Sequence, residues 1–191
     1  MKSNAKNGNC IQGLADFIAA QGHDNLPPVE LWNPSYCGDI GLAIAADGTW
    51  LYQGSPILRR SIVKLFSRVL RCDSDGRHYL VTPVEKVDVT IVDAPFLAVE
   101  MQAEGHGDGQ RLIFRTNVDD IVVCGPDNPI RFVEEAHNGG LKPYLLVRGR
   151  LEALLTRAVF YDLVELACQE QDDPNALFIW SRGMRFALAE A

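Results

Sequence analysis

The chain has 191 residues, of which 47% are hydrophobic and 23% charged, so it is long enough for one domain or two small ones and has an ordinary globular composition. Its formal net charge of −7 argues against bulk nucleic-acid binding, which requires Lys and Arg side chains to neutralise phosphates. No apolar run approaches the ~20 residues that a membrane-spanning helix needs, and the N-terminus has no signal-peptide core. We therefore expect a cytoplasmic protein that does not bind membranes.

Cysteine usage predicts neither a metal site nor a disulfide framework. The number of cysteines is odd, no two of them have the CxxC spacing, and free thiols fit a reducing cytosol. The five are Cys10, Cys37, Cys72, Cys124 and Cys168. No cofactor motif is present, so we expect no metal and no cofactor.

The chain begins with a polar stretch over residues 1–9 and a short amphipathic helix around residues 11–18. Residues 29–36 (VELWNPSY) are expected to form an irregular arm. Its Trp32 is interpreted as a plug at a core edge or, alternatively, as a platform for a ligand.

Residues 38–70 predict a strand, a turn, a second strand and a helix. Apolar residues alternate from Ile40 to Ile44, an Asp-Gly turn follows, and residues 50–52 form the returning strand. We expect Ser55 to cap the helix and Pro56 to open its first turn. The predicted apolar face of this helix comprises Leu58, Ile62, Leu65, Phe66, Val69 and Leu70.

The opposite side of this predicted helix is basic, with no acidic residue among Arg59, Arg60, Lys64, Arg68 and Arg71. The spacing of Arg60, Lys64 and Arg68 predicts a stripe, which is interpreted as a solvated face or as a partner site. Arg59 lies in the first predicted turn, where free N–H groups and the helix dipole favour an anion.

The middle of the chain predicts strands. Residues 79–81 and 84–92 read as strands, and residues 96–103 and 111–115 as a hairpin joined by the loop GHGDG. This glycine-rich loop lacks both the phosphate-binding pattern and a following helix.

The second half repeats parts of the first, which indicates a duplication. The helix between the paired strands is absent from the second copy. The matching segments are DIVVCG at 120–125 with DGTWLY at 47–52, PI at 129–130 with PI at 56–57, and YLLV at 144–147 with YLV at 79–81. Residues 151–169 then predict a long, largely buried helix that ends at 172–174, and residues 178–180 and 186–188 a terminal hairpin.

The ordered series PVELWNP, DGTWLYQGSPILR, VKLF, YLVTPVEKV, DAPF, PYLLVRG and LTRAVFYDLVELA resembles an uncharacterised bacterial family, domain of unknown function 1285. The resemblance runs from about residue 28 to residue 167. It implies a two-domain α+β fold built from a duplicated motif, with a C-terminal half like a pleckstrin-homology fold, a curled antiparallel sheet closed by one helix. It also implies a site at the interface of the halves for a nucleotide-like ligand, a role in signalling, and no known enzymatic activity.

The residues that match the family are Trp32, Pro34, Arg59, Thr82, Pro83, Glu85, Lys86, Asp93, Pro95, Phe96, Asn117, Arg131 and Arg148. We expect an N-terminal tail and helix over residues 1–27, subdomains over 28–104 and 110–170, and an extension over 171–191.

The first functional hypothesis is a non-enzymatic module that binds a small anionic ligand at the subdomain interface. The predicted ligand-binding residues are Arg59, Lys86, Asn117, Arg131 and Arg148. Two arginines from the two halves would clamp a phosphate or carboxylate, with Asn117 supplying hydrogen bonds. In the structural alternative, Arg59 and Arg131 pair with Glu85, Asp93 or Asp120.

Two further hypotheses remain open. An adaptor could bind a partner peptide along a sheet edge. A hydrolase using Asp93 or a histidine ranks last, because His23, His78, His106 and His137 form no catalytic motif. No catalytic residue is predicted.

Overall fold

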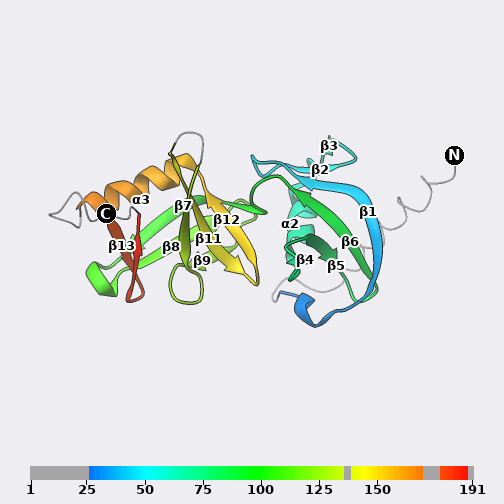
Figure 1. The fold of residues 1–191 in the computed structure, drawn as a ribbon, viewed down its shortest axis with the longest axis horizontal. Helices are drawn as coiled ribbons and strands as arrows, with labels where there is room; N and C mark the ends of the chain where they lie inside the picture. Colours follow the sequence, from blue (N-terminus) through cyan, green and yellow to red (C-terminus); the bar gives the residue numbers. More distant parts are fainter. Residues whose placement is uncertain (1–25, 136–138, 170–176, 189–191) are drawn as a thin grey trace. The chain divides into compact units, whose positions relative to one another are not determined.

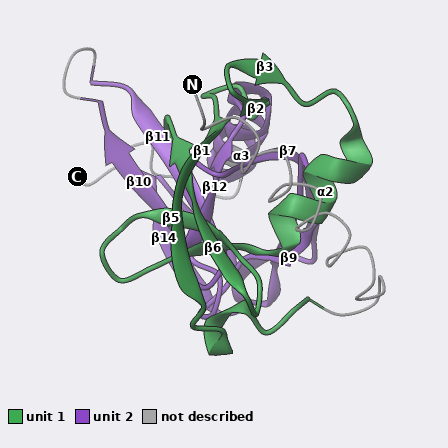
Figure 2. Ribbon diagram, turned by 90° about the vertical axis from the view of Figure 1, so that its right-hand side faces the viewer, with its two compact units in different colours: residues 1–93 green, residues 94–191 purple. Residues whose placement is uncertain are grey.

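The computed structural model describes residues 26–135, 139–169 and 177–188. The chain forms two compact units, Met1–Asp93 and Ala94–Ala191 (Figure 2). The helix predicted around residues 11–18 and the helix end predicted at 172–174 lie outside the described residues.

The first unit contains one six-stranded sheet (Figure 1). Its elements are η1 (Val29–Leu31), β1 (Ser35–Ile44), β2 (Trp50–Tyr52), β3 (Ser55–Pro56), α2 (Arg60–Arg68), β4 (Leu70–Cys72), β5 (His78–Val81) and β6 (Glu85–Ile91). The strand order is β3-β2-β1-β6-β5-β4. The central strands β1 and β6 are parallel and every other neighbouring pair is antiparallel.

The second unit contains another six-stranded sheet and a terminal hairpin. Its elements are β7 (Phe96–Glu104), η2 (Gly107–Gly109), β8 (Arg111–Thr116), β9 (Ile121–Val123), β10 (Ile130–Glu134), β11 (Leu141–Arg148), β12 (Leu151–Leu155), α3 (Arg157–Gln169), β13 (Phe178–Ser181) and β14 (Met184–Ala187). The strand order is β10-β11-β12-β7-β8-β9. The pair β7 and β12 at the centre is parallel, so the expected curled sheet is not antiparallel throughout.

The two sheets share one topology, which confirms the predicted duplication. When the six strands of each sheet are numbered from the first, both sheets have the order third, second, first, sixth, fifth, fourth. In both, the first and sixth strands form the parallel centre. The fifth strands of the two sheets are β5 and β11, which confirms the predicted match of these two segments. The second strands are β2 and β8, whereas the short sequence match had aligned β2 with β9.

The helices differ between the copies. In the first unit α2 lies between the third and fourth strands, and among the described residues of the second unit no helix occurs there. The second unit instead has α3 after its sixth strand, where it packs against β7, β12 and β13. The predicted loss of the helix from the second copy is therefore confirmed.

The core of each unit follows from alternation along its strands. In the first unit the alternate residues Leu42 and Ile44 are buried, and Phe66 of α2 contacts Trp50 of β2 with ring centroids 6.1 Å apart. The β1–β2 turn predicted at Asp47 is present, and the Asp47 carboxylate accepts a hydrogen bond from the Thr49 N–H at 2.9 Å. In the second unit the largest fully buried side chains are Phe96, Phe114, Leu112, Leu145 and Leu163.

Two predicted helix starts were wrong. Ser55 and Pro56 form the short strand β3, and α2 begins only at Arg60, so Leu58 lies ahead of the helix and is 90% exposed. Residues 151–155 form β12 rather than helix, because alternate residues from Leu151 to Leu155 are buried at a strand period. The remaining helix α3 buries only one side, so the prediction of a largely buried helix was also wrong.

The boundary between the units lies between Asp93 and Ala94, ahead of β7. The predicted subdomain 28–104 included residues 96–103 and so divided the hairpin of residues 96–103 and 111–115 between the two halves. Parallel pairing with β12 instead makes β7 the first strand of the second sheet. The terminal hairpin predicted within the extension is present as β13 and β14.

Candidate functional site

The predicted site residues of the first unit have different environments. Lys86 on β6 lies with Nζ 3.1 Å from Oδ2 of Asp73 and 4.4 Å from the centre of the Tyr79 ring. Arg59 is the exposed residue immediately before α2, and no ion pair joins it to any residue that the structure describes. Lys86 is therefore already neutralised, whereas Arg59 faces solvent.

Asp73 has a second basic partner that sequence analysis placed on the outside of the helix. Arg71 lies in β4 and is only 7% exposed, with Nε 2.5 Å from the Asp73 carboxylate. Its Nη1 donates hydrogen bonds of 2.7 Å to the main-chain carbonyls of Val29 and Trp32. Burial alone would raise the pKa of Asp73, but the hydrogen bonds from Arg71 and Lys86 outweigh burial and lower it.

In the second unit, Arg148 and Asn117 support one end of the sheet. Arg148 lies 2.5 Å from the carboxylate of Asp120 and its guanidinium is 4.9 Å from the centre of the Phe96 ring. The Asn117 side-chain oxygen accepts a hydrogen bond from the Leu97 N–H at 3.1 Å, and the Asn117 N–H donates to the Leu97 carbonyl at 2.8 Å. These contacts fix the β8–β9 turn against the start of β7.

Arg131 crosses the face of the same sheet. Its guanidinium binds the Glu152 carboxylate through two hydrogen bonds of 2.6 Å and lies 4.5 Å from the centre of the Tyr144 ring. The hydrogen bonds to Glu152 raise the pKa of Arg131, so the side chain stays charged. This geometry ties β10 to β12 across β11.

The anion clamp accordingly remains a prediction. Lys86, Arg131 and Arg148 each bind a carboxylate of their own unit, so an anionic ligand would have to displace that carboxylate. The structural alternative paired Arg59 and Arg131 with Glu85, Asp93 or Asp120. In the structure, Asp120 forms an ion pair with Arg148 instead.

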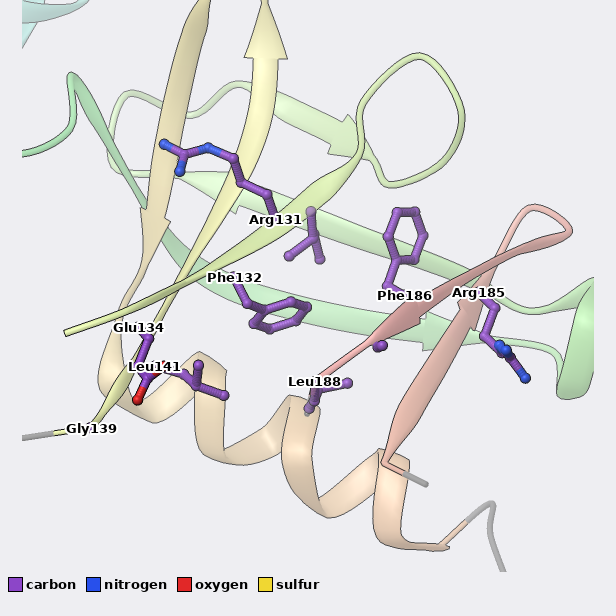
Figure 3. Close-up of a pocket in the computed structure, with 10 residues that line it drawn as sticks. Arg131, Phe132, Glu134, Gly139, Leu141, Arg185, Phe186 and Leu188 are labelled. Carbon is purple, nitrogen blue, oxygen red and sulfur yellow. The ribbon is translucent and has the colours of Figure 1, made fainter. Parts of the chain in front are cut away.

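A groove of about 670 Å³ lies under β10 in the second unit (Figure 3). Its lining comes from β10, the start of β11, and β14 with the residue that follows it. The lining residues are Ile130, Arg131, Phe132, Glu134, Gly139, Leu141, Arg185, Phe186, Ala187 and Leu188. Figure 3 shows the Phe132, Leu141 and Leu188 side chains between the sheet and the helix, with Arg131 pointing to the opposite side of β10.

The groove is built from the tertiary packing of the hairpin. Ser181 Oγ at the end of β13 accepts a hydrogen bond from the Leu112 N–H at 3.0 Å and donates to the Cys124 carbonyl at 2.8 Å. The Gln110 side-chain amide donates to the Trp180 carbonyl at 3.0 Å. These bonds hold the hairpin on β8, and α3 packs against β12 and β13.

The wall of the groove formed by β10 is an open sheet edge. Among the strands that the structure describes, β10 is at one end of the strand order and pairs with β11 alone. The Leu146 N–H donates to the Pro129 carbonyl at 2.9 Å, and in an antiparallel ladder this bonding alternates, so odd-numbered residues of β10 bond to β11. Ile130, Phe132 and Glu134 consequently direct their main-chain groups toward the open edge.

Sequence reasoning missed this site. Residues 130–134 show only a short apolar–polar alternation, which predicts a strand but not its neighbours. Phe132 and Leu188 are separated by more than fifty positions, and their proximity depends on the sheet order and on the hairpin.

Two smaller hollows lie elsewhere. One of about 480 Å³ in the first unit is lined by Tyr36, Arg77, His78 and Asp88, among others. The Tyr36 hydroxyl donates a hydrogen bond to Asp88, which raises the pKa of Tyr36, and Arg77 lies 2.6 Å from the same carboxylate. The other, of about 410 Å³ beside β9, contains Arg115 and Glu100, which form an ion pair.

Burial lowers the pKa of His78, but no hydrogen bond joins its ring to a described nucleophile or carboxylate. The described residues contain no group of three or more His, Cys, Asp or Glu side chains placed to hold a metal. None of the described helices is long and apolar enough to cross a membrane.

Comparison with known proteins identifies relatives over both units. Two family models match, "Domain of unknown function (DUF1285), N-terminal domain" over residues 27–94 and "Protein of unknown function (DUF1285), C-terminal domain" over residues 95–188. A crystal structure of a DUF1285 family protein from Silicibacter pomeroyi DSS-3 is 44% identical, with a TM-score of 0.82 over 92% of this chain and 94% of that one. A second, from Shewanella baltica OS155, is 27% identical, with a TM-score of 0.52 over 66% of this chain and 91% of that one. No curated protein matches.

Proposed function

The chain belongs to the DUF1285 family, and we propose that it is a non-enzymatic binding module that holds an extended peptide along the open edge of β10. The observation that carries this proposal is a strand edge that no described strand covers, above a groove of about 670 Å³ with both apolar and polar lining. A peptide can add a strand to such an edge and place alternate side chains in the pockets beneath it.

Main-chain hydrogen bonds are one of two contributions to the proposed binding. Phe132 and Glu134 each present an N–H and a carbonyl to the edge, and an added strand satisfies these groups at the spacing of a β-ladder. Because these hydrogen bonds involve only main-chain groups, we expect the edge to accept peptides of different sequence.

Side-chain contacts in the groove are the other contribution to the proposed binding. Figure 3 shows Phe132, Leu141 and Leu188 lining the space beneath the edge, with Phe186 beyond them. A residue of the added strand that pairs with Phe132 has its side chain on the same face as the Phe132 ring. Peptides with apolar residues at alternate positions therefore fit best.

The other edge of the same sheet is a poorer site. β9 has only three residues, and the hollow beside it is crossed by the ion pair of Arg115 with Glu100. The longer strand β10 offers five residues to an added strand.

The test is selection of heptapeptides from a random displayed library against the full-length protein, followed by fluorescence anisotropy. We expect N-methylation of a selected peptide to weaken binding with a period of two residues, about tenfold at amides that face β10 and little at the amides between them. Phe132→Ala should weaken binding by a similar factor. Val133→Ala, on the opposite face of the same strand, is the matched control.

Two results would contradict strand addition. Either the library yields no binder, or the selected peptides bind with affinities that do not respond to N-methylation and to Phe132→Ala.

A small anion near Arg59 is the second candidate function. Arg59 is exposed, it immediately precedes α2, and the first turn of α2 contains no acidic residue. Thermal unfolding in phosphate, nucleotides and simple carboxylates should then show a rise of several degrees that is lost in Arg59→Ala. Arg157→Ala, at the exposed start of α3, is the control; equal responses in both variants would exclude a site at Arg59.

A cytoplasmic location and a signalling role are further parts of the proposal. All four cysteines that the structure describes are free thiols, which fits a reducing compartment. Cell fractionation with an antibody against the chain tests the location.

A further inference from the structure

The two arginines that border the β10 groove both point away from it. Arg131 is bound by Glu152 across the outer face of the sheet, and Figure 3 shows its side chain on that side of β10. Arg185 alternates along β14 with the buried residue Phe186, so it lies on the outer face of the hairpin. Its guanidinium is 4.8 Å from the centre of the Phe178 ring, which holds it there. Neither positive charge is therefore presented to the groove.

The charge that the groove does carry is negative. Glu134 is on the same face of β10 as Phe132, and Figure 3 shows it at the end of the groove beside Gly139. Among the described residues that line the groove, it is the only carboxylate. Glu134 is exposed, and no ion pair joins it to any residue in the described part of the chain, whereas its neighbour Glu135 is bound by Lys142 at 3.3 Å. A cationic group of a ligand can thus reach Glu134 without displacing a partner.

The register of β10 turns this charge into a sequence preference. In an antiparallel added strand, successive inward-facing residues pair with Glu134, Phe132 and Ile130 in that order. The residue opposite Glu134 is best basic, because directly opposed side chains of opposite charge stabilise a pair of strands. The other two are best apolar, because Ile130 is buried and the Phe132 ring lies with its centroid 6.4 Å from that of Phe160 on α3.

We propose that the β10 groove selects a cationic segment, with a basic residue at position 1 and apolar residues at positions 3 and 5, bound antiparallel to β10, and that Glu134 determines this preference. This inference rests on the proposed peptide-binding function and adds the charge and the direction of its ligand. Antiparallel pairing is favoured because it is slightly more stable per residue than parallel pairing. The net charge of −7 acts in the same direction, because it attracts a cationic peptide at long range.

The test uses three synthetic probes with capped ends. The first is acetyl-Lys-Thr-Val-Thr-Leu-Thr-amide, the second has Glu in place of Lys, and the third has the first sequence in reverse order. Fluorescence anisotropy with labelled probes should show that the wild-type protein binds the first about fivefold more tightly than the second. The third should bind about threefold less tightly than the first, because an antiparallel strand then places its Lys away from Glu134.

Substitutions at Glu134 provide the decisive comparison. Glu134→Gln should reduce the preference for the first probe over the second to less than about twofold, and Glu134→Lys should make the second bind about threefold more tightly than the first. Asp162→Asn, which removes one exposed negative charge from α3 of the same unit, is the matched control and should leave the preference unchanged. Circular dichroism checks that these exposed substitutions leave the fold intact.

The outcomes separate this inference from the proposed function. Equal affinity of the wild-type protein for the first two probes, or a preference that survives Glu134→Gln, overturns the charge selection, and equal affinity for the first and third overturns the direction. A peptide site at β10 still stands in each case. Failure of all three probes at about 1 mM also overturns the inference, and the library-selected peptides then show independently whether the edge binds peptides at all. A concentration-dependent dimer in sedimentation, abolished by Phe132→Ala, would assign the edge to a second copy of the chain and overturn both.

Discussion

At the scale of single residues, Arg71 differs most from its neighbours in sequence. It follows the basic stripe of α2, yet it is buried in β4 and binds Asp73 and the carbonyls of Val29 and Trp32. One guanidinium thus ties the segment around η1 to the sheet. Its planar set of five donors suits this task better than the single ammonium of Lys.

Replacement of Arg71 by Ala should lower the free energy of unfolding by about 3 kcal/mol, because it removes the hydrogen bonds of a buried guanidinium to the Val29 and Trp32 carbonyls and leaves Asp73 with Lys86 as its basic partner. Urea unfolding monitored by fluorescence measures this loss. Arg111→Ala is the control and should cost less than about 0.5 kcal/mol, since Arg111 pairs with Glu104 on the surface at 3.4 Å. Equal costs would show that the Arg71 contacts add nothing specific.

Cys124 and Cys37 should react very differently with thiol reagents. Burial raises the pKa of the Cys124 thiol to about 12, and hydrogen bonds from the Ile130 backbone and Ser181 reduce this rise only in part. Because the thiolate is the reactive form, iodoacetamide at about pH 8 should leave Cys124 unmodified in the folded protein and modify exposed Cys37. Peptide mass spectrometry identifies the labelled sites. Labelling of Cys124 before unfolding would show that this region opens readily.

At the scale of elements, α3 has one buried side. Val159, Leu163 and Ala167 are buried at four-residue intervals, and the intervening Tyr161 is 62% exposed. The sequence suggested that much of the circumference of this helix is buried, because the residues of β12 were read as the start of the helix. Once Leu151–Leu155 is assigned to the sheet, the fully buried residues of α3 form a single stripe.

Leu163→Ala should therefore cost about 2–5 kcal/mol of unfolding free energy, through lost burial and a residual cavity. Tyr161→Ala, half a turn away on the solvent side, should change stability by less than about 0.5 kcal/mol. Both values come from urea titrations followed by circular dichroism. A large cost for Tyr161→Ala would indicate that this side of α3 is covered.

At the scale of the whole molecule, the duplication gives each unit a complete sheet and core of its own. Each copy retains the parallel centre and the same strand order, although the helix was placed after a different strand. A six-stranded sheet needs an element on one face to bury its apolar residues, and the position of this element in the chain is less constrained than its presence.

Residues 27–94 and 95–188, expressed separately, should each fold. Their lengths lie within the range of small independent domains, and each contains its own buried cluster. Circular dichroism should show strand-rich spectra and a cooperative thermal transition for both. A fragment that remains unfolded would show that its stability depends on the other unit.

Much of this architecture was predictable from local patterns. The alternation from Ile40 to Ile44, the Asp-Gly turn, the hairpin of β7 and β8 and the terminal hairpin all depend on side-chain periodicity and turn chemistry within a few residues. The repeated segments and the family resemblance both indicated the duplication, which the common strand order confirms. The start of α2 was misplaced because Ser-Pro suits both a helix cap and a short edge strand.

The sequence by itself determined most of the strands and turns, the two-fold repeat and the family, because these are encoded in neighbouring residues and in ordered motifs. Only the tertiary structure decided that Arg131 and Arg148 bind Glu152 and Asp120, and that the edge of β10 stands open above a groove closed by the hairpin. The reason is physical. An ion pair or an unpaired edge depends on which strands become neighbours, and that choice is made by burial across the whole sheet rather than by any short segment.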